Sequence, residues 1–198
     1  MRSFTSFALV LMLVATSLAA QETPRDTSAF RARQWGLQFG LGSGLVNLGI
    51  LRFTSPSAAW MLRLDLNAEF LNGTSTTPID TTDANDRSVY FAAGIGRRFY
   101  QANHHKVRSF QSFGIAGSYA DVKQTFGTNT FTSTNASLGL LGELGGAYWV
   151  TSNLSLGGTA TASAGYEHRV RDDSATKVRQ NGWFVSGITV FLSVGLYF

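Results

Sequence analysis

The end of the chain alternates side chains in a way that suits only a β-strand. From Ile188 to Phe198, branched or aromatic apolar residues occupy every second position. Side chains of a strand point alternately to its two faces, so these residues share one face while Thr189, Ser193 and Tyr197 share the other. The last strand is therefore apolar on one face only.

The segment from Trp60 to Phe70 repeats this alternation most clearly. Apolar residues alternate there with a polar set and one methionine, namely Met61, Arg63, Asp65, Asn67 and Glu69. Ten steps of about 3.3 Å, tilted by about 40°, rise about 25 Å, which is the height of the apolar band on a membrane β-barrel. The segment is long enough to cross a membrane as a tilted strand.

Other segments show a weaker form of the same pattern, and we expect eight strands in total. The further strands are predicted at 35–42, 46–53, 89–96, 110–120, 136–149 and 154–167, with the closing strand at about 183–198. Three connections, 71–87, 121–135 and 168–181, are predicted as long loops, and the others as short turns. Long connections on one rim and short turns on the other are typical of an up-and-down barrel with both chain ends on the short-turn side.

The first residues form an export signal. Arg2 precedes an uncharged apolar stretch over residues 4–18, and small residues follow at Ser17, Ala19 and Ala20. This predicts a cleaved signal peptide at 1–20, since the stretch is shorter than the roughly 20 residues of a spanning helix. Residues 21–33 are predicted as a flexible lead-in and residues 34–198 as one barrel domain.

Alternation alone does not distinguish a membrane barrel from a soluble one. The composition of the polar strand faces distinguishes them. In 154–167, that face consists of small residues, from Ser155 and Gly157 to Ser163 and Gly165. Such residues suit a narrow interior better than a water-facing exterior. The sequence thus predicts an all-β, eight-stranded antiparallel transmembrane β-barrel. An exported chain without cysteine, as this one is, holds its fold without disulfides.

With its terminal Phe198, the chain resembles the small outer-membrane barrel family, the OmpA/OmpX-like eight-stranded proteins, in their barrel-only form. The resemblance implies localisation in the bacterial outer membrane, a monomer, and outer-membrane lipids and lipopolysaccharide as surroundings. It also implies that Phe198, Leu196 and Val194 form the signal presented to the barrel-assembly machinery.

Five charged residues are phased toward the predicted interior: Arg63, Asp65, Glu69, Arg98 and Glu143. Unpaired ions are costly in a low-dielectric lumen, so we expect an internal salt-bridge network in which Arg63 contacts at least one of the three acids. A narrow gated ion path through the same residues is the alternative. An eight-stranded interior is filled by its own side chains, which excludes a general porin.

The sequence contains no clear pattern of catalytic residues. Some members of the resembled family modify lipid A, which requires a clustered Ser, His and acid. His104 and His105 lie at the short-turn rim, and His168 follows Glu167 in a strand, where adjacent side chains face opposite ways. No Gly-x-Ser-x-Gly motif occurs. We therefore predict no enzyme, cofactor or metal site, and interpret the acids of 78–86 and 172–173 as surface charge.

Basic residues flank the last predicted loop at Arg169, Arg171, Lys177 and Arg179, and we expect them to contact lipopolysaccharide. The net charge of +4 is spread along the chain and gives no reason to expect nucleic-acid binding.

The predicted function is a non-enzymatic outer-membrane protein that supports envelope integrity and presents surface loops for adhesion or recognition. The alternatives are a lipid-A-modifying enzyme and a soluble periplasmic ligand-binding barrel.

Overall fold

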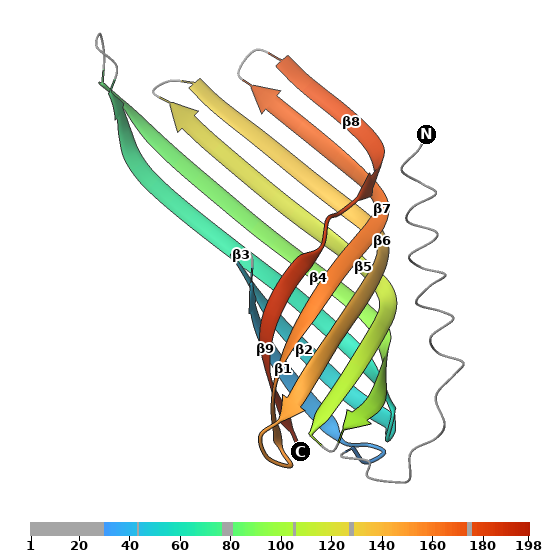
Figure 1. Cartoon of the computed structure of the whole chain (residues 1–198). Coiled ribbons are helices and arrows are strands. Elements are labelled where there is room, and N and C mark those ends of the chain that lie inside the picture. Colours follow the sequence, from blue (N-terminus) through green and yellow to red (C-terminus); the bar gives the residue numbers. More distant parts are fainter. Residues whose placement is uncertain (1–29, 43, 77–80, 105, 127–128, 174–175) are drawn as a thin grey trace.

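The protein folds into one antiparallel β-barrel (Figure 1). The computed structural model describes residues 30–42, 44–76, 81–104, 106–126, 129–173 and 176–198, so the predicted signal peptide at 1–20 lies outside the described residues. The strands are β1 (Trp35–Gly42), β2 (Leu45–Ser55), β3 (Ala58–Thr76), β4 (Thr81–His104), β5 (Val107–Phe126), β6 (Asn129–Trp149), β7 (Leu154–Asp173), β8 (Thr176–Val185) and β9 (Thr189–Tyr197). In the described part of the chain, no helix is long and apolar enough to span a membrane.

Each strand pairs with its sequence neighbours except at the end of the chain, where the ring closes because β9 pairs with both β7 and β1. β8 and β9 pair with successive parts of β7 and so together fill the place of one strand in the wall. The nine strands therefore make a ring of eight. Trp35 and Phe198 exchange backbone hydrogen bonds of 3.0 and 3.1 Å. The first and last strands therefore begin and end at the same rim, as the even strand count predicts.

The wall is apolar outside and polar inside, which confirms the predicted membrane barrel. Along β3, Leu62 and Leu66 are 41% and 49% exposed, whereas Arg63 and Asp65 are only 6% and 9% exposed. A soluble barrel would show the opposite orientation, with its apolar faces turned to a central cavity. The exterior is thus suited to acyl chains rather than to water.

The three connections predicted as long loops are largely strand, and here the prediction was wrong. β3 and β4 pair without interruption from Ala58↔Phe99 to Thr76↔Thr81. β5 and β6 likewise pair as far as Phe126↔Asn129, and β7 and β8 as far as Asp173↔Thr176. Beyond a bilayer both faces of a strand meet water, so the apolar alternation that identifies a strand fades while its hydrogen bonds continue.

The first hairpin is much shorter than the other three (Figure 1). Its turn holds Gly44 at φ +73°, a conformation that favours glycine. β2 pairs with β3 only up to Leu66, so in the described residues the rest of β3 has no partner on that side. β8 likewise pairs only with β7. The ring is therefore complete in its lower part and open between β3 and β8 above.

Glycines allow neighbouring strands to approach closely in the lower wall. A Cβ on Gly96 would lie 2.5 Å from the carbonyl oxygen of Phe113, and one on Gly42 would overlap the carbonyl of Val190. Contacts this short do not occur in real structures, so a larger residue would force the strands apart. These glycines therefore serve the close packing of neighbouring strands.

Candidate functional site: the charged lumen and the outer rim

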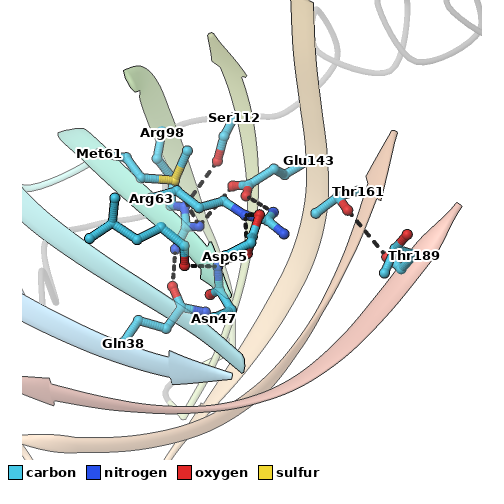
Figure 2. A network of polar contacts seen from close by, with 11 residues as sticks. Gln38, Asn47, Met61, Arg63, Asp65, Arg98, Ser112, Glu143, Thr161 and Thr189 are labelled. Carbon is cyan, nitrogen blue, oxygen red and sulfur yellow. Dashed lines mark hydrogen bonds and ion pairs between the residues drawn. The ribbon is translucent and has the colours of Figure 1, made fainter. Parts of the chain in front are cut away.

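A cluster of four charged side chains crosses the lumen, as Figure 2 shows. Arg63 binds Asp65 through Nε at 2.8 Å and Glu143 through a terminal nitrogen at 2.7 Å. Arg98 reaches the other oxygen of Glu143 at 2.8 Å. These contacts join β3, β4 and β6 across the barrel, and their two positive and two negative charges balance.

Neutral side chains complete the hydrogen bonding of this cluster. Arg98 donates to Gln38 Oε1 at 2.6 Å and to Ser112 Oγ at 2.9 Å, while Asn47 donates to Asp65 Oδ1 at 2.6 Å (Figure 2). Strands β1, β2 and β5 are tied to the cluster in this way. Buried ions are stable only when their remaining donors and acceptors are satisfied, and this arrangement satisfies them.

Two aromatic rings flank the same arginines. The guanidinium carbon of Arg98 lies 4.1 Å from the ring centre of Phe110, and that of Arg63 lies 4.8 Å from the ring centre of Phe191. A guanidinium over a ring face is attracted by its quadrupole. Because Phe191 belongs to β9, the cluster also contacts the strand that closes the ring.

Glu69, the fifth residue phased inward, lies further along β3 and is exposed. It pairs in register with Ser88, and no ion pair to it occurs within the described part of the chain. The structure therefore brings four of the five predicted interior charges together and leaves Glu69 above them.

An aromatic plug fills the lumen below the cluster. Phe30 is 1% exposed, and its ring centre lies 4.0 Å from Phe53, 4.6 Å from Tyr100, 5.1 Å from Trp149 and 5.4 Å from Tyr197. Sequence reasoning missed Phe30, because it belongs to the polar segment predicted as a lead-in. Its only signal was a single large apolar residue among polar neighbours.

Above the cluster lies a cavity of about 230 Å³. Charged residues Arg63, Asp65 and Glu167 line it together with small and aromatic residues, among them Ala92, Ser118 and Phe184. This volume is below the range of about 300–1,000 Å³ typical of ligand sites. With the cluster and the plug beneath it, the described lumen has no wide passage.

The four basic residues near the far rim do not share one surface. Arg169 points inward and contacts Glu167 at 3.3 Å, and the alternation of β7 places Arg171 on the same inner face. Lys177 contacts Asp172 at 3.6 Å on the outer face, which Arg179 shares. Lys177 and Arg179 thus lie on the outer face of the wall, and Arg169 and Arg171 on the inner face.

The histidines do not form a catalytic cluster in the described residues. The Nδ1 atom of His168 lies 2.5 Å from Asn181 Oδ1 on the outer face, while Glu167 faces the lumen and contacts Asn135. His104 is the last residue of β4, and His105 lies outside the described residues. Within the described ranges, no three His, Cys, Asp or Glu side chains are placed to hold a metal ion.

Comparison with known proteins finds a likeness in structure but not in sequence. No protein-family model matches the chain, and no curated protein matches its sequence. The outer membrane protein OprG from Pseudomonas aeruginosa is similar in structure, with a TM-score of 0.60 and 11% identity over 87% of this chain and 99% of that one. A major outer membrane protein from Thermus thermophilus has a TM-score of 0.55 and 14% identity, covering 83% of this chain and 98% of that one.

The fold is therefore that of the small outer-membrane β-barrel proteins. Identities this low show a common architecture and do not carry over any activity. Together with the apolar exterior, the architecture places the chain in the bacterial outer membrane.

Proposed function

We propose that the protein is a non-enzymatic outer-membrane barrel that supports envelope integrity and presents extracellular hairpins for adhesion or recognition. The observation that carries the proposal is a division of the molecule into two parts. The lower lumen is filled by the charge cluster and the aromatic plug, whereas β3 to β8 continue well above the first hairpin. Passage of solutes through the lumen is disfavoured, so we assign the function to the barrel wall and the projecting hairpins.

The long hairpins are continuously hydrogen-bonded strand pairs. In β3 and β4 the pairing extends through Leu71↔Asp86 and Asn72↔Asn85. Continuous ladders hold the two backbones in a fixed register, so a partner would meet an ordered strand pair. Polar residues dominate there, as expected for strands that leave the bilayer.

The test is a deletion strain complemented by two forms of the protein. One form is the full chain, and the other lacks residues 72–85, with Leu71 joined to Asp86 through an Asn-Gly turn that preserves their register. We expect both forms to restore detergent resistance and to migrate as heat-modifiable barrels, but only the full chain to restore surface binding. A deletion strain with normal detergent resistance contradicts the integrity role, and normal binding by the short form contradicts the recognition role of this hairpin.

The opening between β3 and β8 favours a second candidate function, the holding of a small amphiphile that enters from the outer leaflet. The unpaired edges flank the cavity lined by Tyr90, Phe184 and Phe191. Backbone edges at membrane depth are tolerated where they line a cavity. A single alkyl chain with a polar head would meet both the aromatic and the charged lining.

Two neighbouring alanines of β4 provide a matched test of this candidate. Ala92 lines the cavity, whereas Ala93 lies on the opposite face of the strand. We expect saturable binding of a fluorescent dodecyl amphiphile to the purified barrel, lost in Ala92→Trp and kept in Ala93→Trp. Equal binding by the two variants would exclude the cavity as the site.

A further inference from the structure

One row of the outer wall alternates tryptophan and arginine. In the register of the sheet, Trp35 pairs with Arg52, Arg52 with Trp60, and Trp60 with Arg97. These four residues, here called the Trp–Arg row, cross β1, β2, β3 and β4 side by side. Both tryptophans are exposed, so the row faces the surroundings of the barrel.

The arginines of the row lie against aromatic faces. The guanidinium carbon of Arg52 is 5.3 Å from the ring centre of Trp35. That of Arg97 is 5.4 Å from Trp60 and 5.9 Å from Phe99, and its Nη2 donates to Thr54 Oγ1 at 3.2 Å. The rings hold the two cations close to the wall instead of letting them extend freely into solvent.

Neither arginine has an anionic partner in the part of the chain that the structure describes. The interior arginines Arg63 and Arg98, by contrast, each bind carboxylates. Guanidinium groups form their strongest contacts with carboxylate or phosphate oxygens, often through two parallel hydrogen bonds. The guanidinium groups of the row can therefore donate hydrogen bonds to an anion outside the described protein.

The position of the row along the wall suggests which acceptor is available. On the side toward the hairpin tips lie the apolar residues Leu37, Ile50 and Leu62. On the other side come the β2–β3 turn and the chain end at Phe198, which mark the short-turn rim. Tryptophan and arginine at this border fit the headgroup level, where an arginine costs far less than at the bilayer centre.

The row is confined to one side of the barrel. On the opposite side, the outward residues Tyr148 and Leu156 pair in register near the same rim and carry no charge. Two further exposed cations lie at this rim: Arg33, fixed beside β2 by a backbone hydrogen bond of 2.8 Å to Phe53, and Lys106 in the β4–β5 turn, whose carbonyl accepts a hydrogen bond of 2.8 Å from the backbone of Trp149. The contacts between arginine and tryptophan are thus a local feature of β1 to β4, whereas Arg33 and Lys106 are cations of the same rim outside the row.

We propose that the Trp–Arg row binds the phosphate of an anionic phospholipid from the periplasmic leaflet. The headgroup phosphate would accept hydrogen bonds from Arg52 and Arg97, while the acyl chains lie along the apolar residues above them. Lipopolysaccharide belongs to the other leaflet and would not reach this rim. The site is independent of the proposed hairpin function, because it lies at the opposite end of the barrel.

Quenching by brominated lipids tests the site directly, since the row carries two tryptophans. The full barrel, with Trp149→Phe and Trp183→Phe to remove other emission, is folded into vesicles in which brominated phosphatidylglycerol or brominated phosphatidylcholine competes with unlabelled lipid. We expect about a thirtyfold preference for the anionic lipid at low salt, given two basic residues at the interface. The preference should decrease at a salt concentration of about 1 M, which screens exposed charges.

Two charge-matched variants complete the experiment. Arg52→Gln with Arg97→Gln should lose the preference, whereas Lys177→Gln with Arg179→Gln removes the same charge from the other rim and should keep it. If the parent barrel shows no preference for the anionic lipid, the proposal is wrong. It is also wrong if both double variants lose the preference equally, which would indicate a general effect of charge, or if the variant of Arg52 and Arg97 keeps the full preference.

Discussion

Replacing Glu143 by glutamine should expose the energetic role of the charge cluster. Glu143 is 3% exposed and binds Arg63 at 2.7 Å and Arg98 at 2.8 Å. Glutamine keeps the shape and removes the charge. Arg63 still has Asp65, but Arg98 loses the carboxylate that it binds and keeps the neutral acceptors Gln38, Ser112 and Met61 Sδ.

The expected loss follows from the charge balance. Opposite unit charges about 4 Å apart attract by about 4 kcal/mol at an effective dielectric constant of ~20, and the desolvation of the ions offsets part of this. Removing one partner of a buried pair typically costs about 3–5 kcal/mol. We expect a loss in this range for Glu143→Gln, and a similar loss for Arg98→Met.

Combining the two changes restores neutrality, because Arg63 and Asp65 remain as a pair. The double variant should therefore be more stable than the sum of the single losses predicts, by about 2 kcal/mol or more. Urea unfolding of the barrel in lipid vesicles, followed by tryptophan fluorescence, measures all three. Glu69→Gln serves as control and should change the stability by less than about 0.5 kcal/mol. A coupling energy near zero, or equal effects of Glu143→Gln and Glu69→Gln, would refute the reasoning.

Three further predictions use the same unfolding assay. Gly96→Ala should lower the stability by about 1–3 kcal/mol because its methyl group would collide with the Phe113 carbonyl, whereas Gly182→Ala, with nothing within 4 Å, should be nearly neutral; equal effects would contradict the close approach. Phe30→Ala should cost about 3–5 kcal/mol by emptying the centre of the plug, and a neutral result would show that the plug does not contribute to stability. Leu140→Arg on the lipid-facing wall should cost about 2–4 kcal/mol, against about 1 kcal/mol or less for Tyr148→Arg near the rim; the reverse order would contradict the assigned membrane position.

The sequence predicts the architecture well where one face of a strand meets lipid. Leu62, Arg63 and Leu66 reveal their orientation through alternation alone, because the two environments differ so strongly. Above the bilayer this contrast disappears, and residues 71–87 were predicted as a loop although 71–76 continue β3 and 81–87 belong to β4. The split of the closing strand into β8 and β9 was also missed, although the outward apolar residues change there from odd positions, Trp183 and Val185, to even positions from Ile188 onward.

The site was predicted in part for related reasons. The inward phase of Arg63 and Glu143 follows from strand periodicity, but their contact depends on strands that are far apart in the chain. Phe30 has no periodic neighbours and could not be placed from sequence. Arg52 shares the outward face of its strand with Leu48 and Ile50, and the cross-strand register with Trp35 explains an arginine at this position.

The pairing of β1 with β9 also bears on how the molecule is made. From β1 to β8, adjacent strands are joined through hairpins of consecutive segments, so they can zip together as local units. The seam between Trp35 and Phe198 requires the two ends of the domain to meet, which carries the largest loop-closure entropy. Sealing the cylinder therefore has the highest entropic cost of any strand pairing in the barrel, and the outward-facing Leu196 and Val194 lie on the strand that completes it, with Phe198 directly after that strand.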